Sequence, residues 1–112
     1  MNVPERLELT PTEASCLVKA QEAVLIDVRE PEEYATAHVD GARLMPMQSI
    51  PAELQKLETL AEDSKLLVLC HHGVRSLQVV SWLRERGLEN CFSVAGGIDL
   101  WSRDVDPAVP RY

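Results

Sequence analysis

Residues 66–76 read LLVLCHHGVRS, an apolar run that ends at Cys70 and continues through two histidines, a glycine and an arginine. A short continuous apolar run is typical of a central strand that is covered on both faces. Ligands of open parallel sheets bind beyond the carboxyl ends of the strands. The stretch therefore allows two interpretations of Cys70. It is either a buried strand residue or a thiolate placed to react at a strand end.

The chain on either side alternates strand-like and helix-like segments. Further strand-like segments lie at residues 6–9, 23–28, 42–47 and 91–97. Helix-like segments lie at residues 10–20, 30–38, 49–63, 75–88 and 98–104. Such alternation predicts an α/β domain with a mostly parallel sheet of about five strands and helices on both faces.

Several residues mark where the predicted helices begin and end. Thr10 is the expected N-cap of the first helix, with Pro11 at its first position and Glu13 completing a capping box. Ser49 is the expected cap of the helix within residues 49–63. Gly87 supplies the C-terminal stop of the helix that follows Cys70.

The composition of the chain argues against several classes of function. The 112 residues carry a net charge of −7, which argues against nucleic-acid binding because phosphates require a basic surface. No stretch approaches the roughly 20 apolar residues of a membrane span, and the first residues lack the apolar core of a secretory signal. We expect a cytoplasmic monomer with one domain over residues 1–112. Its core would be residues 6–104, and the prolines of residues 105–112 predict an extended tail.

The three cysteines, Cys16, Cys70 and Cys91, are an odd number without a CxxC pair. This pattern suggests neither a disulfide framework nor a cysteine zinc site. The adjacent His71 and His72 do not suggest a metal site either, because neighbouring residues rarely converge on one ion. We therefore expect no metal and no cofactor. Cys16 and Cys91 are interpreted as inert small hydrophobic residues, and the alternative that one of them is a redox-active resolving thiol stays open.

The position of Cys70 favours the reactive interpretation. It precedes a helix N-terminus, which offers unpaired N–H groups and the positive end of the helix dipole. Gly73 allows the backbone to curl so that its amides point inward. Together with Arg75, these features should stabilise a thiolate or bind an anion. The alternative, a core cysteine, is common for apolar strands, but a packed strand end does not require the sequence HHGVR.

Three motifs in order resemble the rhodanese family. They are LIDVREPEEYATAHVDGARLMPM (residues 25–47), CHHGVRS (residues 70–76) and VAGGIDLW (residues 94–101). The final PRY (residues 110–112) is also similar to the ending of single-domain members. The similarity covers nearly the whole chain, from about Arg6 to the end. It implies a three-layer rhodanese-like α/β domain whose catalytic cysteine forms a persulfide.

The resemblance also implies an activity and a site. Cys70 would attack the outer sulfur of thiosulfate or of a persulfide donor, and would then pass that sulfur to cyanide, a thiol or a protein acceptor. The substrate anion would lie in a cradle of main-chain amides, those of His71, His72, Gly73, Val74 and Arg75. Members that specialise in thiosulfate often carry basic residues directly after the cysteine. Here His71 and His72 occupy these positions, which leaves two alternatives: an efficient thiosulfate enzyme, or mainly a carrier that passes sulfur between proteins.

Two other functions are compatible with a cysteine at a strand end. Phosphatases and arsenate reductases of related architecture separate their cysteine and arginine by five residues. Four residues separate Cys70 from Arg75, which favours sulfur transfer. A non-catalytic module that binds an anion or a peptide with the same loop is the second alternative, although such domains usually lack the cysteine.

The remaining polar and aromatic candidates are given structural roles. His38 is expected to make a structural hydrogen bond. Arg29 and Glu33 are expected to form a local salt link. Phe92 and Trp101 are expected in the core.

Overall fold

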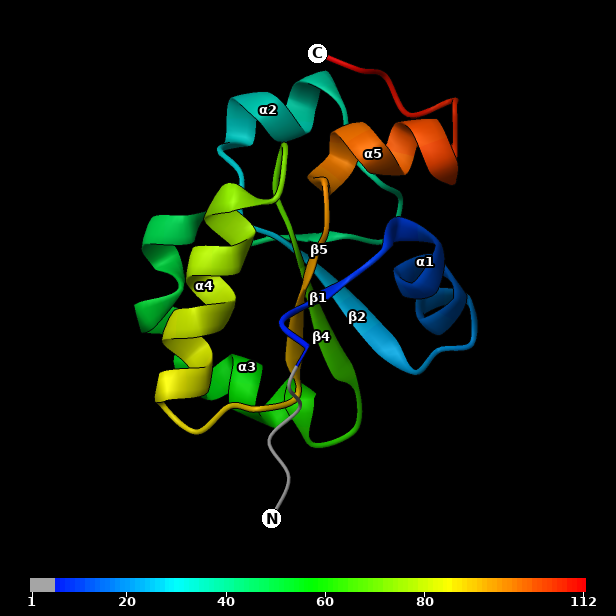
Figure 1. The fold of residues 1–112 in the computed structure, drawn as a ribbon. Coiled ribbons are helices and arrows are strands. Elements are labelled where there is room, and N and C mark those ends of the chain that lie inside the picture. Colours follow the sequence, from blue (N-terminus) through cyan, green and yellow to red (C-terminus); the bar gives the residue numbers. More distant parts are fainter. Residues whose placement is uncertain (1–5) are drawn as a thin grey trace.

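The five strands form one sheet in the order β1-β5-β4-β2-β3, and every neighbouring pair is parallel (Figure 1). The structure, a computed structural model, describes residues 6–112, so residues 1–5 of the predicted domain lie outside it. The strand bounds are β1 Glu8–Leu9, β2 Ala23–Asp27, β3 Arg43–Leu44, β4 Lys65–Leu69 and β5 Cys91–Val94. The predicted parallel sheet of about five strands is confirmed.

Helices cover both faces of this sheet, giving three layers (Figure 1). Their bounds are α1 Pro11–Lys19, α2 Pro31–Thr36, α3 Leu54–Ala61, α4 Val74–Glu85 and α5 Gly97–Asp104. Helices α1 and α5 pack on one face, and α3 and α4 pack on the other. Helix α2 lies across the end of the sheet where the strands terminate, beside the C-terminus (Figure 1).

The position of β4 in the centre of the sheet explains why its last four residues are all apolar. Leu67 and Leu69 belong to the core under α1 and α5, whereas Leu66 and Val68 belong to the core under α3 and α4. None of the four is more than 1% exposed. Because successive side chains of a strand point to opposite faces, a strand covered on both sides needs apolar residues at every position.

The helix boundaries follow the predicted signals except at Ser49. The Thr10–Glu13 capping box and the end of α4 before Gly87, whose φ is +90°, are confirmed. The predicted cap at Ser49 is wrong, because its hydroxyl donates to the Pro46 carbonyl over 2.7 Å. The chain instead forms two 3₁₀ turns, Met47–Ser49 and Pro51–Glu53, before α3 begins.

The prolines of residues 105–112 predicted an extended tail, and this segment contains no helix or strand. Val109 is only 6% exposed and lies in the core under α1 and α5. Its carbonyl accepts a hydrogen bond from Ser102 Oγ over 2.6 Å. Proline restricts the backbone but does not prevent the apolar residue between two prolines from being buried. The segment is therefore packed against the domain.

Within residues 6–112, the structure has no helix that is both long enough and apolar enough to cross a bilayer.

Candidate active site

Cys70 follows β4 directly and is only 1% exposed. Its Sγ accepts hydrogen bonds from the amide N–H of Gly73 over 3.1 Å and of Ser76 over 3.3 Å. The Cys70 thiol in turn donates to the Ser76 hydroxyl oxygen over 3.3 Å. The cysteine is thus buried and its sulfur accepts two amide hydrogen bonds, which a purely structural core cysteine does not require.

The local sequence explains this geometry. Gly73 adopts a φ of +102°, a left-handed conformation that glycine reaches without strain, and α4 begins at the next residue. The amide of Ser76 lies in the first turn of α4, where N–H groups have no acceptor within the helix. The sulfur of Cys70 takes the place of that acceptor. The positive end of the α4 dipole also points toward it.

Two serines extend the polar contacts of the sulfur into the core. Ser76 Oγ lies 2.7 Å from Ser93 Oγ on β5, and both residues are fully buried. Neither serine was predicted from the sequence as a site residue. A signal was present, since Ser93 is a polar residue within an otherwise apolar strand.

The start of α5 donates backbone hydrogen bonds to the loop that begins at Cys70. The Ile98 amide donates to the Cys70 carbonyl over 2.8 Å, and the Asp99 amide donates to the His71 carbonyl over 3.2 Å. A β-carbon at Gly97 would overlap both of these carbonyl oxygens. The close approach of the two backbones therefore requires glycine at residue 97, which accounts for part of the VAGG motif.

The five residues predicted to form the cradle all lie in the turn between Cys70 and α4 or in the first turn of α4, but their environments differ. The amide of Gly73 contacts the sulfur. Val74 is 67% exposed. The His71 ring stacks on the rings of His72 and Tyr112 with centroids 3.9 Å apart in each case, and its Nε2 lies 2.9 Å from the Tyr112 main-chain oxygen. The tail thus reaches the loop, a contact that the sequence did not predict.

Arg75 is bound to a carboxylate from α2. Its Nη1 and Nη2 donate to the two carboxylate oxygens of Glu33 over 2.7 and 2.9 Å. This hydrogen bonding lowers the pKa of Glu33 to about 2 and raises the pKa of Arg75. The predicted Arg29–Glu33 salt link is therefore wrong, because the Glu33 carboxylate faces Arg75.

Arg29 pairs instead with Asp27, at the end of β2. Its Nε and Nη2 donate to the two Asp27 carboxylate oxygens over 2.9 and 2.7 Å, and both side chains are fully buried. Further donors reach the carbonyls of Glu33 and Ala37 and the hydroxyl of Tyr112. Because a buried charge needs such complete pairing, Arg29 acts as a structural anchor for α2 and the tail.

The other polar, aromatic and cysteine candidates lie outside the Cys70 loop. The Nδ1 of His38 lies 3.2 Å from the Tyr34 carbonyl, which confirms the expected hydrogen bond. Phe92 and Trp101 are buried in the core, as predicted. Cys91 is also buried, and its burial raises the pKa of its thiol. Cys16 is exposed on α1, and its interpretation as an inert residue stays a prediction.

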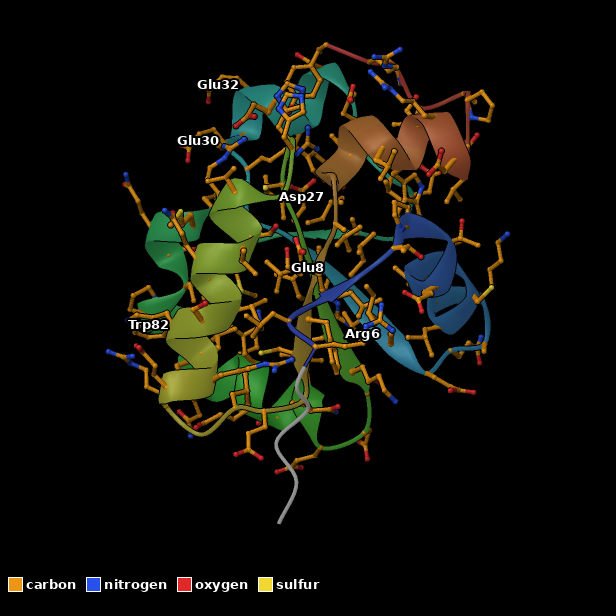
Figure 2. The ribbon with its side chains drawn as sticks, viewed as in Figure 1. Arg6, Glu8, Asp27, Glu30, Glu32 and Trp82 are labelled. Atoms are coloured by element: carbon orange, nitrogen blue, oxygen red, sulfur yellow. The ribbon has the colours of Figure 1, made fainter. Side chains whose placement is uncertain are left out.

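A shallow groove of about 640 Å³ reaches the loop at His72 and Gly73. It runs along α4, where Val74, Leu77 and Trp82 contribute apolar side chains. Figure 2 shows Trp82 projecting from the flank of α4 that faces away from α1. The groove next to the loop is therefore larger than the binding of a small anion requires.

Comparisons with known proteins agree with this architecture. The family described as "Rhodanese-like domain" matches residues 10–104. The thiosulfate sulfurtransferase GlpE of Haemophilus influenzae strain PittEE is 41% identical over 105 residues, which cover 94% of this chain and 96% of that protein. The chloroplastic rhodanese-like/PpiC domain-containing protein 12 of Arabidopsis thaliana is 37% identical over 92 residues, 81% of this chain but only 31% of that longer relative.

Solved structures give the same result. The human single-domain sulfurtransferase TSTD1 superposes with a TM-score of 0.77 at 27% identity, covering 88% of this chain and 96% of that one. A rhodanese-related protein from Thermoplasma volcanium has a TM-score of 0.75 at 28% identity, covering 94% of this chain and 98% of that one. The chain therefore belongs to the family of rhodanese-like domains.

Proposed function

We propose that the protein is a sulfurtransferase in which Cys70 carries the transferred sulfur. The observation that carries the proposal is the position of Cys70 Sγ, which accepts two amide hydrogen bonds at the N-terminus of α4. Such surroundings stabilise a thiolate, the reactive form of cysteine. Relatives named as sulfurtransferases that match over most of their length support the same activity.

The reaction has two steps. The Cys70 thiolate attacks the outer sulfur of thiosulfate or of a persulfide. The sulfur–sulfur bond of the donor breaks, sulfite or a thiolate leaves, and Cys70 becomes a persulfide. Cyanide, a thiol or a protein acceptor then attacks the terminal sulfur and releases the Cys70 thiolate. The N–H groups that face Sγ stabilise negative charge at the sulfur in both steps.

The environment of Arg75 argues against the phosphatase and arsenate reductase alternatives. A phosphoryl-transfer site needs a cation that binds the equatorial oxygens of the substrate. Both terminal nitrogens of Arg75 are instead bound to Glu33. The non-catalytic alternative gives no reason for the buried sulfur of Cys70 to accept two amide hydrogen bonds.

Intact-mass measurement tests the proposal. After incubation with thiosulfate or with a small thiol persulfide, we expect the protein to gain one sulfur atom. Cys70→Ser should abolish the gain. Cys16→Ser, which removes an exposed thiol and leaves Cys70 in place, should retain it. A gain that survives Cys70→Ser, or that is lost with Cys16→Ser, contradicts the proposal.

A further inference from the structure

The permanent positive charge within residues 70–76 lies on Arg75 alone. Glu33 neutralises this charge with a bidentate ion pair, the geometry that binds guanidinium most specifically. The pair is largely shielded from water, since the side chains of Arg75 and Glu33 are only 33% and 21% exposed. Screening by salt therefore weakens it less than an ordinary surface pair.

Two further donors fix the Glu33 carboxylate in place. Its Oε2 accepts the Glu30 amide N–H over 2.9 Å, and its Oε1 accepts the Tyr112 hydroxyl over 2.8 Å. The Tyr112 oxygen in turn accepts a hydrogen bond from buried Arg29 over 2.8 Å. Donors from Arg75, the main chain and the tail thus hold the Glu33 carboxylate facing the arginine.

Two further carboxylates lie at the start of α2, where solvent screens their charge. Glu30 and Glu32 are exposed, and neither has an ion-pair partner among residues 6–112. Figure 2 shows both projecting outward from the same end of α2. The site that surrounds Cys70 thus offers donors to sulfur but little net positive charge to a substrate.

The low net positive charge of the site affects the two possible sulfur donors, thiosulfate and a thiol persulfide, differently. When a thiolate attacks thiosulfate, three negative charges meet at the transition state, because thiosulfate is a dianion. When it attacks a protonated thiol persulfide, R–S–SH, only one negative charge is present. In that reaction the S–S bond breaks, R–S⁻ leaves, and Cys70–S–SH forms with no net oxidation or reduction. Like charges in a site of low dielectric repel strongly.

We propose that Glu33 is the residue that sets donor specificity: by neutralising Arg75, it makes this site prefer a thiol persulfide to thiosulfate. The inference rests on the proposed sulfurtransferase function and narrows its substrate class. Glu33 acts through Arg75, so it is a positioning residue and not a catalytic one.

The test compares two donors in two matched variants, with cyanide as the common acceptor. Glu33→Gln keeps an oxygen that accepts the Glu30 N–H and removes the charge. Glu32→Gln removes the same charge from an exposed position on the same helix. The donors are thiosulfate and the persulfide of 2-mercaptoethanol, and the readout is the ratio of their kcat/KM values.

We expect Glu33→Gln to raise the ratio of thiosulfate to persulfide kcat/KM about tenfold, the effect of removing one charge near a dianion. Glu32→Gln should change it less than about twofold, because an exposed charge is screened by solvent. Arg75→Gln should shift the ratio in the opposite direction, because it leaves the Glu33 carboxylate uncompensated. Opposite shifts from the two halves of one ion pair are not produced by a loss of structure, which lowers both rates together.

Several outcomes overturn the inference. They are an unchanged ratio in Glu33→Gln, equal shifts in Glu33→Gln and Glu32→Gln, and shifts of the same sign in Glu33→Gln and Arg75→Gln. If Glu33→Gln does not fold, an Arg75→Gln ratio that does not fall is sufficient to overturn it. If neither donor adds sulfur to Cys70 in the unaltered chain, the proposed function itself fails, and the mass measurement shows this separately.

Discussion

Ser76 contacts the sulfur of Cys70 in two ways, through its amide and through its hydroxyl. Ser76→Ala removes the hydroxyl only, and it leaves the buried Ser93 hydroxyl without its partner at 2.7 Å. We expect sulfur transfer to slow by about three- to tenfold, and the free energy of unfolding to fall by about 1–2 kcal/mol. Steady-state kinetics and urea denaturation measure the two effects.

Ser93→Ala is the control for this prediction. It breaks the same hydroxyl pair but removes a group that does not contact Sγ, so stability should fall by a similar amount while the rate falls less. Equal losses of rate in Ser76→Ala and Ser93→Ala would show that the contact with sulfur has no role of its own.

The ion pair of Glu33 predicts a pH dependence of stability. The hydrogen bonds from Arg75 lower the pKa of Glu33 to about 2 from its ordinary value of 4.5. A group whose pKa is lower in the folded state stabilises the fold above its unfolded pKa, and this stabilisation is lost as the pH falls through the folded value. The contribution of Glu33 should therefore be complete above about pH 5 and disappear between about pH 4.5 and pH 2.

Urea denaturation of the unaltered chain and of Glu33→Gln across this range measures the effect. We expect the two unfolding free energies to differ by about 1–2 kcal/mol more at about pH 7 than at about pH 2.5, a value that allows for partial screening by solvent. Other carboxylates titrate alike in both proteins and cancel in the difference. Parallel profiles would mean that the ion pair does not contribute to folding.

Separation along the chain determined which site residues could be predicted from the sequence. Cys70 and Gly73 were identified because the strand end, the glycine and the following helix are adjacent in the chain. Glu33 and Tyr112 were not assigned to Arg75 or His71, since 42 and 41 residues separate them. The local spacing of Arg29 and Glu33 instead suggested a pairing that the buried Asp27 prevents.

At the active site, the start of α5 packs closely against the backbone of the loop that follows Cys70. Gly97→Ala would place a methyl group against the carbonyl oxygens of Cys70 and His71, at a φ of +60°. Since neither backbone can yield without moving the loop, we expect the free energy of unfolding to fall by about 2–4 kcal/mol and persulfide formation to be lost. Urea denaturation and intact-mass measurement check both effects.

Gly41→Ala separates backbone strain from crowding. Gly41 also has a left-handed φ, +86°, but no atom lies within 4 Å of the point where its β-carbon would stand. This variant should lose only about 1 kcal/mol and should retain sulfur uptake. If the two alanine variants were equally stable, the close packing of α5 on the loop would not be important for folding.

Elements buried on both faces were easier to predict than those whose boundaries depend on turns. Strands β2 and β4 follow directly from continuous apolar runs, because few other structures bury every side chain. The segment from Met47 to Glu53 was predicted mostly as the first part of a helix. It forms 3₁₀ turns instead, since Ser49 bonds backward to Pro46 and proline at residue 51 lacks the N–H that a continuous helix would use.

At the scale of the whole molecule, residues 105–112 contact both the core and the active-site loop. The order of the motifs was sufficient to predict the rhodanese-like fold from the sequence. That order carried no information on where residues 105–112 would lie, because one valine between two prolines forms no periodic pattern. In the structure this segment buries Val109 against α1 and α5 and brings Tyr112 to His71 and Glu33. The same short segment thus contacts both the hydrophobic core and residues that border the Cys70 loop.

If residues 105–112 belong to the cooperative unit, removing a buried group from them should destabilise the entire domain. Val109→Ala removes two methyl groups from a side chain that is 6% exposed, and we expect the free energy of unfolding to fall by about 1–3 kcal/mol. The urea midpoint should decrease while the m-value stays unchanged, because the same surface is exposed on unfolding. Ala108→Ser, at the exposed neighbouring position, should change the free energy of unfolding by less than about 0.5 kcal/mol. A tail that unfolds independently would give a different result: Val109→Ala would leave the main transition unchanged and increase only the hydrogen exchange of residues 105–112.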